Sequence, residues 1–253
     1  MPRSEKPPGR LAIVLVNALA YLYIVFGTFF FAMSSVLLGW IGPRGNMMFR
    51  LSRPWSRGLL ASSGVRLDAE FEVPLDPERS YVYLANHQSY FDIPALMPVA
   101  PGQVRFAAKR SLFRIPVFGW SLWVGGFIPI DREEPSKATQ AFSAAAERVR
   151  QGASVLFFPE GTRSADGKLA PFQRGGFLIA LKAGLPIVPV GIEGARQVMP
   201  RGRVWVTPGR ITVRFGTPLD CAAYGVKGRG RLMADVRRKV AELARIEMAD
   251  ETL

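Results

Sequence analysis

The feature that most constrains this chain is a long uncharged run near its beginning. From Leu11 to Ile41 the sequence contains no Asp, Glu, Lys, Arg or His. About 20 residues of apolar helix suffice to cross the hydrocarbon core of a membrane, whereas the apolar part of a secretory signal usually has only ~7–15 residues. We therefore expect a retained membrane anchor here, which places the rest of the chain beside a lipid surface.

A second segment, residues 45–63, mixes apolar side chains with arginines, as is typical of a helix that lies at a membrane interface. Basic residues flank the uncharged run on both sides and slightly favour a cytoplasmic location for the chain on its C-terminal side. Spanning the bilayer and dipping into one leaflet both fit the pattern. We expect anchoring helices over residues 1–63 and a globular domain over 64–253, on the cytoplasmic side of the cell inner membrane.

The formal net charge of +13 is compatible with nucleic acid, an anionic membrane or a phosphorylated substrate as partner. No recognised nucleic-acid motif is present and the beginning of the chain is apolar, so we expect a membrane lipid bilayer and no nucleic acid. The single cysteine, Cys221, excludes an internal disulfide. One cysteine and one histidine also exclude a His/Cys zinc site, and no metal is expected.

Beyond residue 64, short apolar strands alternate with helices. From Val65 to Val73 apolar and charged residues alternate, which is the period of a half-buried strand. The pattern predicts an α/β fold: a central, mostly parallel mixed sheet flanked by helices, preceded by the hydrophobic helical anchor. The further strands are expected at 81–85, 104–108, 126–130, 154–158, 187–191, 203–206 and 211–215, and the helices at 136–151, 176–182 and 231–248.

His87, the only histidine, follows strand 81–85 directly, and Asp92 comes five residues later. Residues five apart on a regular helix point roughly 140° away from each other, so a turn must lie between them if their side chains are to touch. The carboxylate would then accept from Nδ1–H and leave Nε2 as a general base. The spacing alone fits a structural histidine equally well.

A second polar segment, Phe158-Pro159-Glu160-Gly161-Thr162-Arg163, follows strand 154–158 abruptly. The planar fork of Arg163 suits a phosphate group. Arg132 follows a third strand, and the carboxyl ends of parallel strands meet at one edge of a sheet. We therefore expect the His–Asp pair and these arginines to face one crevice. No G-x-S-x-G nucleophile elbow and no Walker or G-x-G-x-x-G phosphate loop is present.

Four blocks, in this order, resemble those of glycerolipid acyltransferases, and most closely those of bacterial 1-acyl-sn-glycerol-3-phosphate acyltransferases. The blocks are Asn86–Asp92, Gly125–Arg132, Phe158–Ser164 and Leu185–Val190. The resemblance covers roughly residues 65–220. It implies transfer of a fatty acyl group from acyl-CoA or acyl carrier protein to the free hydroxyl of 1-acyl-glycerol-3-phosphate, giving phosphatidic acid. It also implies that the chain needs no cofactor and forms no acyl-enzyme.

The resemblance assigns roles to individual residues. His87 would be the general base and Asp92 would orient it. Four residues of the third block would form the acceptor site, and Arg163 would hold the phosphate together with Arg132. Lys109 is a weaker candidate for the same phosphate, and Pro189 would shape a pocket wall. The acceptor-site residues are Glu160, Gly161, Thr162 and Arg163.

Two other functions are compatible with the sequence. The blocks do not distinguish 1-acyl-glycerol-3-phosphate from another lysophospholipid acceptor, such as a lyso-ornithine lipid. A non-catalytic membrane-binding module could keep the same fold, although the presence of His87, Asp92, Glu160 and Arg163 argues against it.

Overall fold

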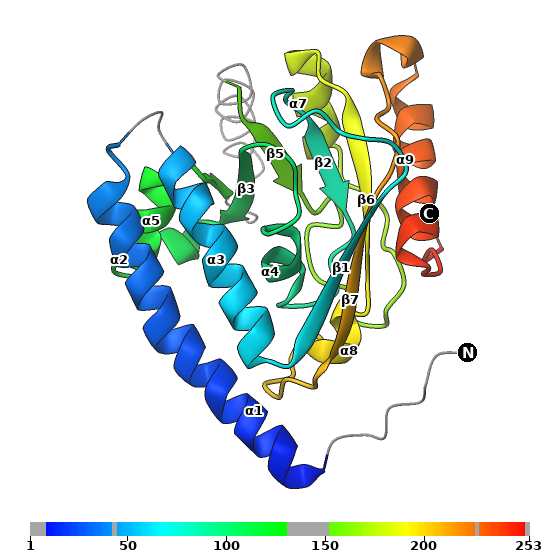
Figure 1. Ribbon diagram of the computed structural model, residues 1–253. Helices are drawn as coiled ribbons and strands as arrows, with labels where there is room; N and C mark the ends of the chain where they lie inside the picture. The colour runs from blue at the N-terminus through cyan, green and yellow to red at the C-terminus, as the bar shows by residue number, and fades with distance from the viewer. Residues whose placement is uncertain (1–8, 42–44, 131–151, 226–227, 251–253) are drawn as a thin grey trace.

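The structure, a computed structural model, describes residues 9–41, 45–130, 152–225 and 228–250. Helices and strands alternate along most of the chain, as Figure 1 shows. The helices are α1 (Arg10–Leu22), α2 (Thr28–Leu38), α3 (Asn46–Ser62), α4 (Asp92–Leu96), α5 (Phe118–Val124), α7 (Gly175–Ala183), α8 (Ala195–Val198) and α9 (Arg229–Ala244). The strands are β1 (Val65–Phe71), β2 (Val82–Ala85), β3 (Val104–Lys109), β4 (Ile128–Ile130), β5 (Ser154–Phe157), β6 (Ile187–Glu193) and β7 (Gly209–Phe215).

The strands form one seven-stranded sheet in the order β1-β7-β6-β2-β5-β3-β4. Every neighbouring pair is parallel except β6 and β7, which run antiparallel. All residues of β2 and β5 are buried, as expected for central strands that are covered on both faces. The predicted fold class, a mostly parallel mixed sheet flanked by helices, is confirmed.

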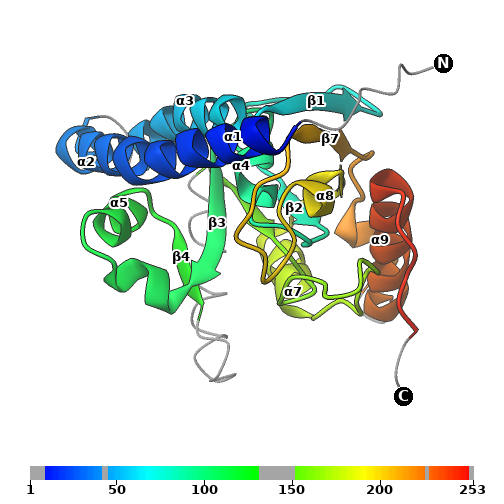
Figure 2. The ribbon, with the colours of Figure 1, turned by 90° about the horizontal axis from the view of Figure 1, so that it is seen from below.

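Helices cover both faces of this sheet (Figure 2). Val82 and Leu84 of β2 point into the apolar core shared with α7 and α9. Tyr83 and Ala85 point the other way, into the core shared with α3 and α4. The alternation follows from the period of two along a strand, and it leaves the residues just beyond each strand at the edge of the sheet.

The uncharged run forms a single long helix, Arg10–Leu38, in which a π-helical turn at Tyr23–Gly27 joins α1 to α2. The helix is long and apolar enough to cross a membrane. It lies beside α3, where the Trp55 indole donates to Thr28 Oγ1 over 3.1 Å. Ala20 and Phe49 belong to the same apolar core as the sheet. The boundary at residues 63 and 64 stays a prediction, but the segments on its two sides share a core.

The prediction of a strand at 203–206 is wrong. These residues form an extended segment without a partner strand, because the backbone of Val206 pairs with a side chain instead. The Asn17 amide donates to the Val206 carbonyl and accepts its N–H, both over 2.8 Å. The Tyr21 hydroxyl donates to the carbonyl of Val204. The first helix is therefore bound directly to the segment that follows α8.

Two smaller expectations also changed. The closing helix ends at Ala244 rather than at residue 248, because Arg245 adopts a left-handed conformation with φ +54°. The strand expected at 126–130 is limited to Ile128–Ile130, and it is preceded by α5. The helix expected at 136–151 lies outside the described residues.

Candidate active site

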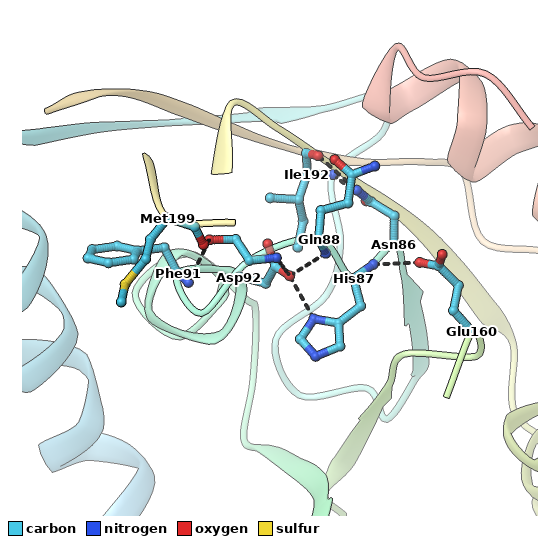
Figure 3. A network of polar contacts seen from close by, with 9 residues as sticks. Asn86, His87, Gln88, Phe91, Asp92, Glu160, Ile192 and Met199 are labelled. Carbon is cyan, nitrogen blue, oxygen red and sulfur yellow. Dashed lines mark hydrogen bonds and ion pairs between the residues drawn. The ribbon is translucent and has the colours of Figure 1, made fainter. Parts of the chain in front are cut away.

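The chain leaves the sheet after β2, turns, and enters α4 at Asp92. We call residues 86–92 the histidine turn. His87 Nδ1 lies 2.6 Å from Asp92 Oδ2, at the centre of the network in Figure 3. The predicted turn between the two residues is confirmed, and no continuous helix runs through both. Asp92 contributes its carboxylate from the first turn of α4, which places the charge at the favourable end of that helix.

The surroundings of Asp92 determine the tautomer of the histidine. Its side chain is completely buried, and Oδ2 also accepts the backbone N–H groups of Gln88 and Ser89, each over 2.8 Å. A carboxylate oxygen that accepts from two N–H groups is best paired with a third donor, so Nδ1 of His87 carries the proton. The other ring nitrogen, Nε2, is therefore unprotonated when the ring is neutral, and it can act as a base.

The turn after β5 clamps the histidine backbone from both sides. Glu160 Oε1 accepts the N–H of His87 over 2.6 Å, and the carbonyl of His87 accepts the N–H of Ser164 over 2.8 Å. Glu160 Oε2 accepts the N–H of Ala170 over 3.0 Å. Both carboxylate oxygens of Glu160 therefore bind backbone groups, which gives this residue a positioning role; an acceptor-site role for Glu160 stays a prediction.

The pKa of Glu160 is shifted from its ordinary value. Burial raises its pKa from the ordinary 4.5 to about 7, although the N–H groups of His87 and Ala170 favour the charged form. The nearby Asp92 carboxylate raises it further, and Arg237 opposes this. The clamp on the histidine backbone therefore depends on a carboxylate that changes its charge near neutral pH.

The imidazole ring is held by packing as well as by its hydrogen bond. The Phe158 ring stacks on it with centroids 4.0 Å apart and planes 17° from parallel. The His87 side chain is 14% exposed, and Figure 3 shows its second nitrogen turned away from Asp92. The ring is thus fixed on one side and open on the side of Nε2.

Three buried polar residues of the histidine turn, Asn86, Gln88 and Ser89, were not among the predicted site residues, and all three hold it in place. Gln88 Nε2 donates to the Gly167 carbonyl over 2.7 Å. Asn86, fully buried, donates to the Ile192 carbonyl over 2.9 Å and accepts its N–H over 2.7 Å. Ser89 Oγ donates to the Met199 carbonyl over 2.8 Å and accepts the N–H of Phe91 over 3.0 Å. The sequence signal that could have revealed them is their place in the polar segment directly after a buried strand.

The remaining predicted residues differ in their positions relative to the histidine turn. The Arg163 guanidinium lies 3.5 Å above the centre of the Tyr90 ring, beside the histidine turn, whereas Thr162 is exposed. Lys109 is exposed at the end of β3, on the same edge of the sheet, and no described contact joins it to the turn. Arg132 lies outside the described residues.

The backbone conformation explains the glycine at position 161, and Pro189 takes part in the pairing of β6. Gly161 has φ +75°, and a Cβ atom there would come within 2.4 Å of the Gln173 amide, so only glycine fits this turn without strain. Pro189 is buried within β6 opposite Leu84, and its carbonyl accepts the N–H of Gly216. Its predicted role in a pocket wall stays a prediction.

An apolar cavity of about 100 Å³ lies on the α3 side of the sheet. Its walls come mainly from α2, α3, α4, α5 and β3, and they include Ile93 of α4 and Met97, which directly follows that helix. A lining of this kind suits a hydrocarbon chain. Within the described residues, no three His, Cys, Asp or Glu side chains gather into a group that could hold a metal ion.

The chain is similar to known proteins over most of its length. A family model described as Acyltransferase matches residues 66–193. A 1-acyl-sn-glycerol-3-phosphate acyltransferase of Salmonella typhimurium is 33% identical over 184 residues, which cover 70% of this chain and 74% of that protein. The chloroplastic 1-acyl-sn-glycerol-3-phosphate acyltransferase BAT2 of Brassica napus is 40% identical over 64% of this chain.

The chain spans about half the length of the plant and animal relatives that it matches, for example 45% of the Brassica napus protein and 55% of the Bos taurus 1-acyl-sn-glycerol-3-phosphate acyltransferase alpha. Among solved structures it is similar to the 1-acyl-sn-glycerophosphate (LPA) acyltransferase PlsC from Thermotoga maritima. The TM-score is 0.76 at 25% identity, and the match covers 95% of this chain and 99% of that one.

Proposed function

The chain belongs to the acyltransferase family, and we propose that it transfers a fatty acyl group to the free hydroxyl of 1-acyl-glycerol-3-phosphate, giving phosphatidic acid. The donor is an acyl thioester, either acyl-CoA or acyl carrier protein. The observation that carries this proposal is the His87 imidazole, which Asp92 orients with Nε2 open to a substrate. The similarity to the Salmonella typhimurium acyltransferase over 70% of the chain supports the choice of acceptor.

In the proposed mechanism, His87 Nε2 removes the proton from the acceptor hydroxyl as its oxygen attacks the thioester carbonyl. The buried Asp92 carboxylate stabilises the imidazolium that forms, through the 2.6 Å bond to Nδ1. The tetrahedral intermediate collapses, the C–S bond breaks, and the thiolate takes the proton from Nε2. A positioned base of this kind contributes about 10²–10⁴-fold in rate. The alignment of the two bound substrates contributes further.

The charge beside the histidine turn supports a phosphorylated acceptor. Arg163 lies next to Ser164, whose N–H binds the His87 carbonyl, so its guanidinium is close to the base. A guanidinium offers the planar, bidentate donors that suit a phosphate. Lys109, at the end of β3, and Arg132 are proposed as further phosphate contacts.

The apolar features support a substrate that is taken directly from a lipid layer. The cavity between α2, α3 and α4 is lined by apolar side chains and reaches the helix that carries Asp92. The long helix exposes large apolar side chains along its length, among them Leu15, Leu19, Phe26 and Phe29. We place the protein at the cell inner membrane, with its active site on the cytoplasmic side, where basic residues gather beside a membrane.

The contacts of the first helix favour an anchor that lies in one leaflet. Asn17 and Tyr21 bind the segment after α8, and Thr28 binds Trp55 of α3. A helix held at three points along its length by the globular domain has to stay beside that domain. Spanning the bilayer would separate these partners, and it would leave a buried backbone pair and an indole N–H without hydrogen bonds.

The test is acyl transfer by the full-length protein in lipid vesicles, with one acyl thioester offered to lysophosphatidic acid and to a lyso-ornithine lipid. We expect phosphatidic acid to be the dominant product. We also expect His87→Ala to abolish transfer while the protein still sediments with vesicles. Preferential acylation of the lyso-ornithine lipid would favour that alternative acceptor, and unchanged turnover by the His87→Ala variant would end the mechanism proposed here.

A further inference from the structure

A segment outside the four sequence blocks lies directly against the histidine turn. Residues 199–206 follow α8, and we call them the bridging segment. Ser89 Oγ donates to the Met199 carbonyl over 2.8 Å, and Ser89 forms an antiparallel bridge with Pro200. The other end of the segment is bound to the first helix through Asn17 and Val206. The segment is therefore held at both ends, and Arg201 follows the residue that pairs with Ser89.

Arg201 reaches from this segment to the predicted phosphate residue. Its Nη1 donates to the backbone carbonyl of Arg163 over 3.4 Å, across 38 positions of sequence. The Arg163 guanidinium itself lies over the Tyr90 ring. Two guanidinium groups from distant segments thus lie beside the histidine turn, and in the described part of the chain neither forms an ion pair with a carboxylate.

The chemistry of the second guanidinium suits an anion with more than one charge. A guanidinium has five N–H donors, and the contact with the Arg163 carbonyl engages one nitrogen of Arg201, which leaves donors on an exposed side chain. A phosphate monoester carries about −1.5 to −2 charges at pH 7 and three acceptor oxygens. Because Arg201 belongs to a different segment from Arg163, its guanidinium can add a contact to such a group beyond those proposed for Arg163, Arg132 and Lys109.

We propose that Arg201 is a specificity-determining residue that, together with Arg163, selects acceptors bearing a phosphate monoester over acceptors with one negative charge fewer. The proposal rests on the proposed function, because it assigns a residue to the headgroup of the same acceptor. It also explains why the segment after α8 is fixed to the histidine turn, since a headgroup contact has to keep a constant distance from the base.

The test compares lysophosphatidic acid with its phosphate monomethyl ester, which has the same chain and the same free hydroxyl but carries one negative charge. The full-length protein is assayed in vesicles of zwitterionic lipid with a single acyl thioester. For Arg201→Gln we expect KM for lysophosphatidic acid to rise about tenfold, with kcat within about twofold, because a charge-assisted bond of ordinary strength is lost. KM for the methyl ester should change at most about twofold, which also shows that the variant is folded.

Arg203→Gln is the matched control. Arg203 is exposed on the same segment and has the same charge, and no described contact joins its side chain to Arg163. Its KM values should equal those of the wild type. The proposal is overturned if Arg201→Gln leaves KM for lysophosphatidic acid unchanged, if both acceptors are affected equally, or if Arg203→Gln has the same effect. A wild-type protein that transfers no acyl group to lysophosphatidic acid would instead refute the proposed function itself.

Discussion

The contact between Asn17 and Val206 makes a sharp prediction about how the membrane helix affects the active site. Asn17 is 4% exposed within a helix of mostly apolar residues, and its amide both donates to and accepts from the backbone of Val206. The same bridging segment binds Ser89 of the histidine turn through Met199. An Asn17→Leu substitution therefore leaves the helix more apolar and removes its buried link to the bridging segment, while the exposed hydrogen bond between Tyr21 and Val204 remains.

The size of the effect follows from the groups that lose their partners. Val206 is completely buried, so the substitution leaves one N–H and one carbonyl without hydrogen bonds. Each such group costs roughly 1–3 kcal/mol, so the attachment of the bridging segment should weaken by roughly 2–6 kcal/mol. Each ~1.4 kcal/mol is a factor of ten in an equilibrium constant, and local opening of the segment should increase at least tenfold. Acyl transfer should fall several-fold, because Ser89 and Arg201 lose their fixed positions.

The assay combines amide hydrogen exchange at the bridging segment with acyl transfer on vesicles. Ser34→Leu is the control, since Ser34 Oγ donates over 2.8 Å to the Phe30 carbonyl within the same helix. Both variants gain apolar surface, and both should remain bound to vesicles. We expect faster exchange and lower activity for Asn17→Leu alone. If Asn17→Leu keeps wild-type protection and wild-type turnover, the helix is merely an anchor and this reasoning fails.

Three further predictions concern the residues around the base. Asp92→Asn should lower kcat by about 10²–10⁴-fold with little change in KM, measured by steady-state transfer, because the charge that stabilises the protonated imidazole is lost. The pKa of Glu160 in the folded protein is about 7, against an ordinary 4.5, so folding favours the protonated carboxyl. This stabilisation is fully present below about pH 4.5 and is lost as the pH rises to about 7. Urea unfolding in detergent should show the wild type losing up to about 3 kcal/mol over this range relative to Glu160→Gln, and parallel curves would contradict the assignment. Gly161→Ala should lower the unfolding temperature more than Gly184→Ala, because both glycines have positive φ but a Cβ atom at 161 also collides with Gln173; equal shifts would show that the collision is relieved.

Much of the fold and the central pair of the site could be predicted because their signals are local. Apolar runs such as Ser154–Phe157 are short, continuous and closed by a turn, which is the pattern of a buried parallel strand. The turn between His87 and Asp92 could be anticipated because side chains five residues apart on a regular helix point away from each other, so that a contact between them requires a turn. In both cases, neighbours in sequence determine the structure.

The roles that escaped prediction depend on residues that are distant in sequence. The acceptor-site role of Glu160 stays a prediction. Its positioning role was not predicted, because it comes from two backbone N–H groups, one of which belongs to His87, 73 positions away. Residues 203–206 have the composition of a strand, but the partner of Val206 is a side chain 189 positions away. Periodicity shows which face of a helix or strand is buried. It contains no information about which distant group forms the hydrogen bonds of a given backbone N–H or carbonyl.

The two asparagine pairs show how this chain fixes a turn that the sheet itself cannot reach. A side-chain amide can present an N–H and a carbonyl oxygen to one residue, as a peptide group does. Asn86 therefore extends the pairing of β2 with β6 beyond the end of β2, through Ile192. Asn17 does the same for Val206 from the membrane helix. The backbone that carries His87 is thus fixed during folding, so substrate binding need not supply that ordering entropy. The cost appears at Glu160, whose buried charge opposes folding at neutral pH. A site that is ordered in advance at the expense of stability allows the base to meet both substrates from a fixed position.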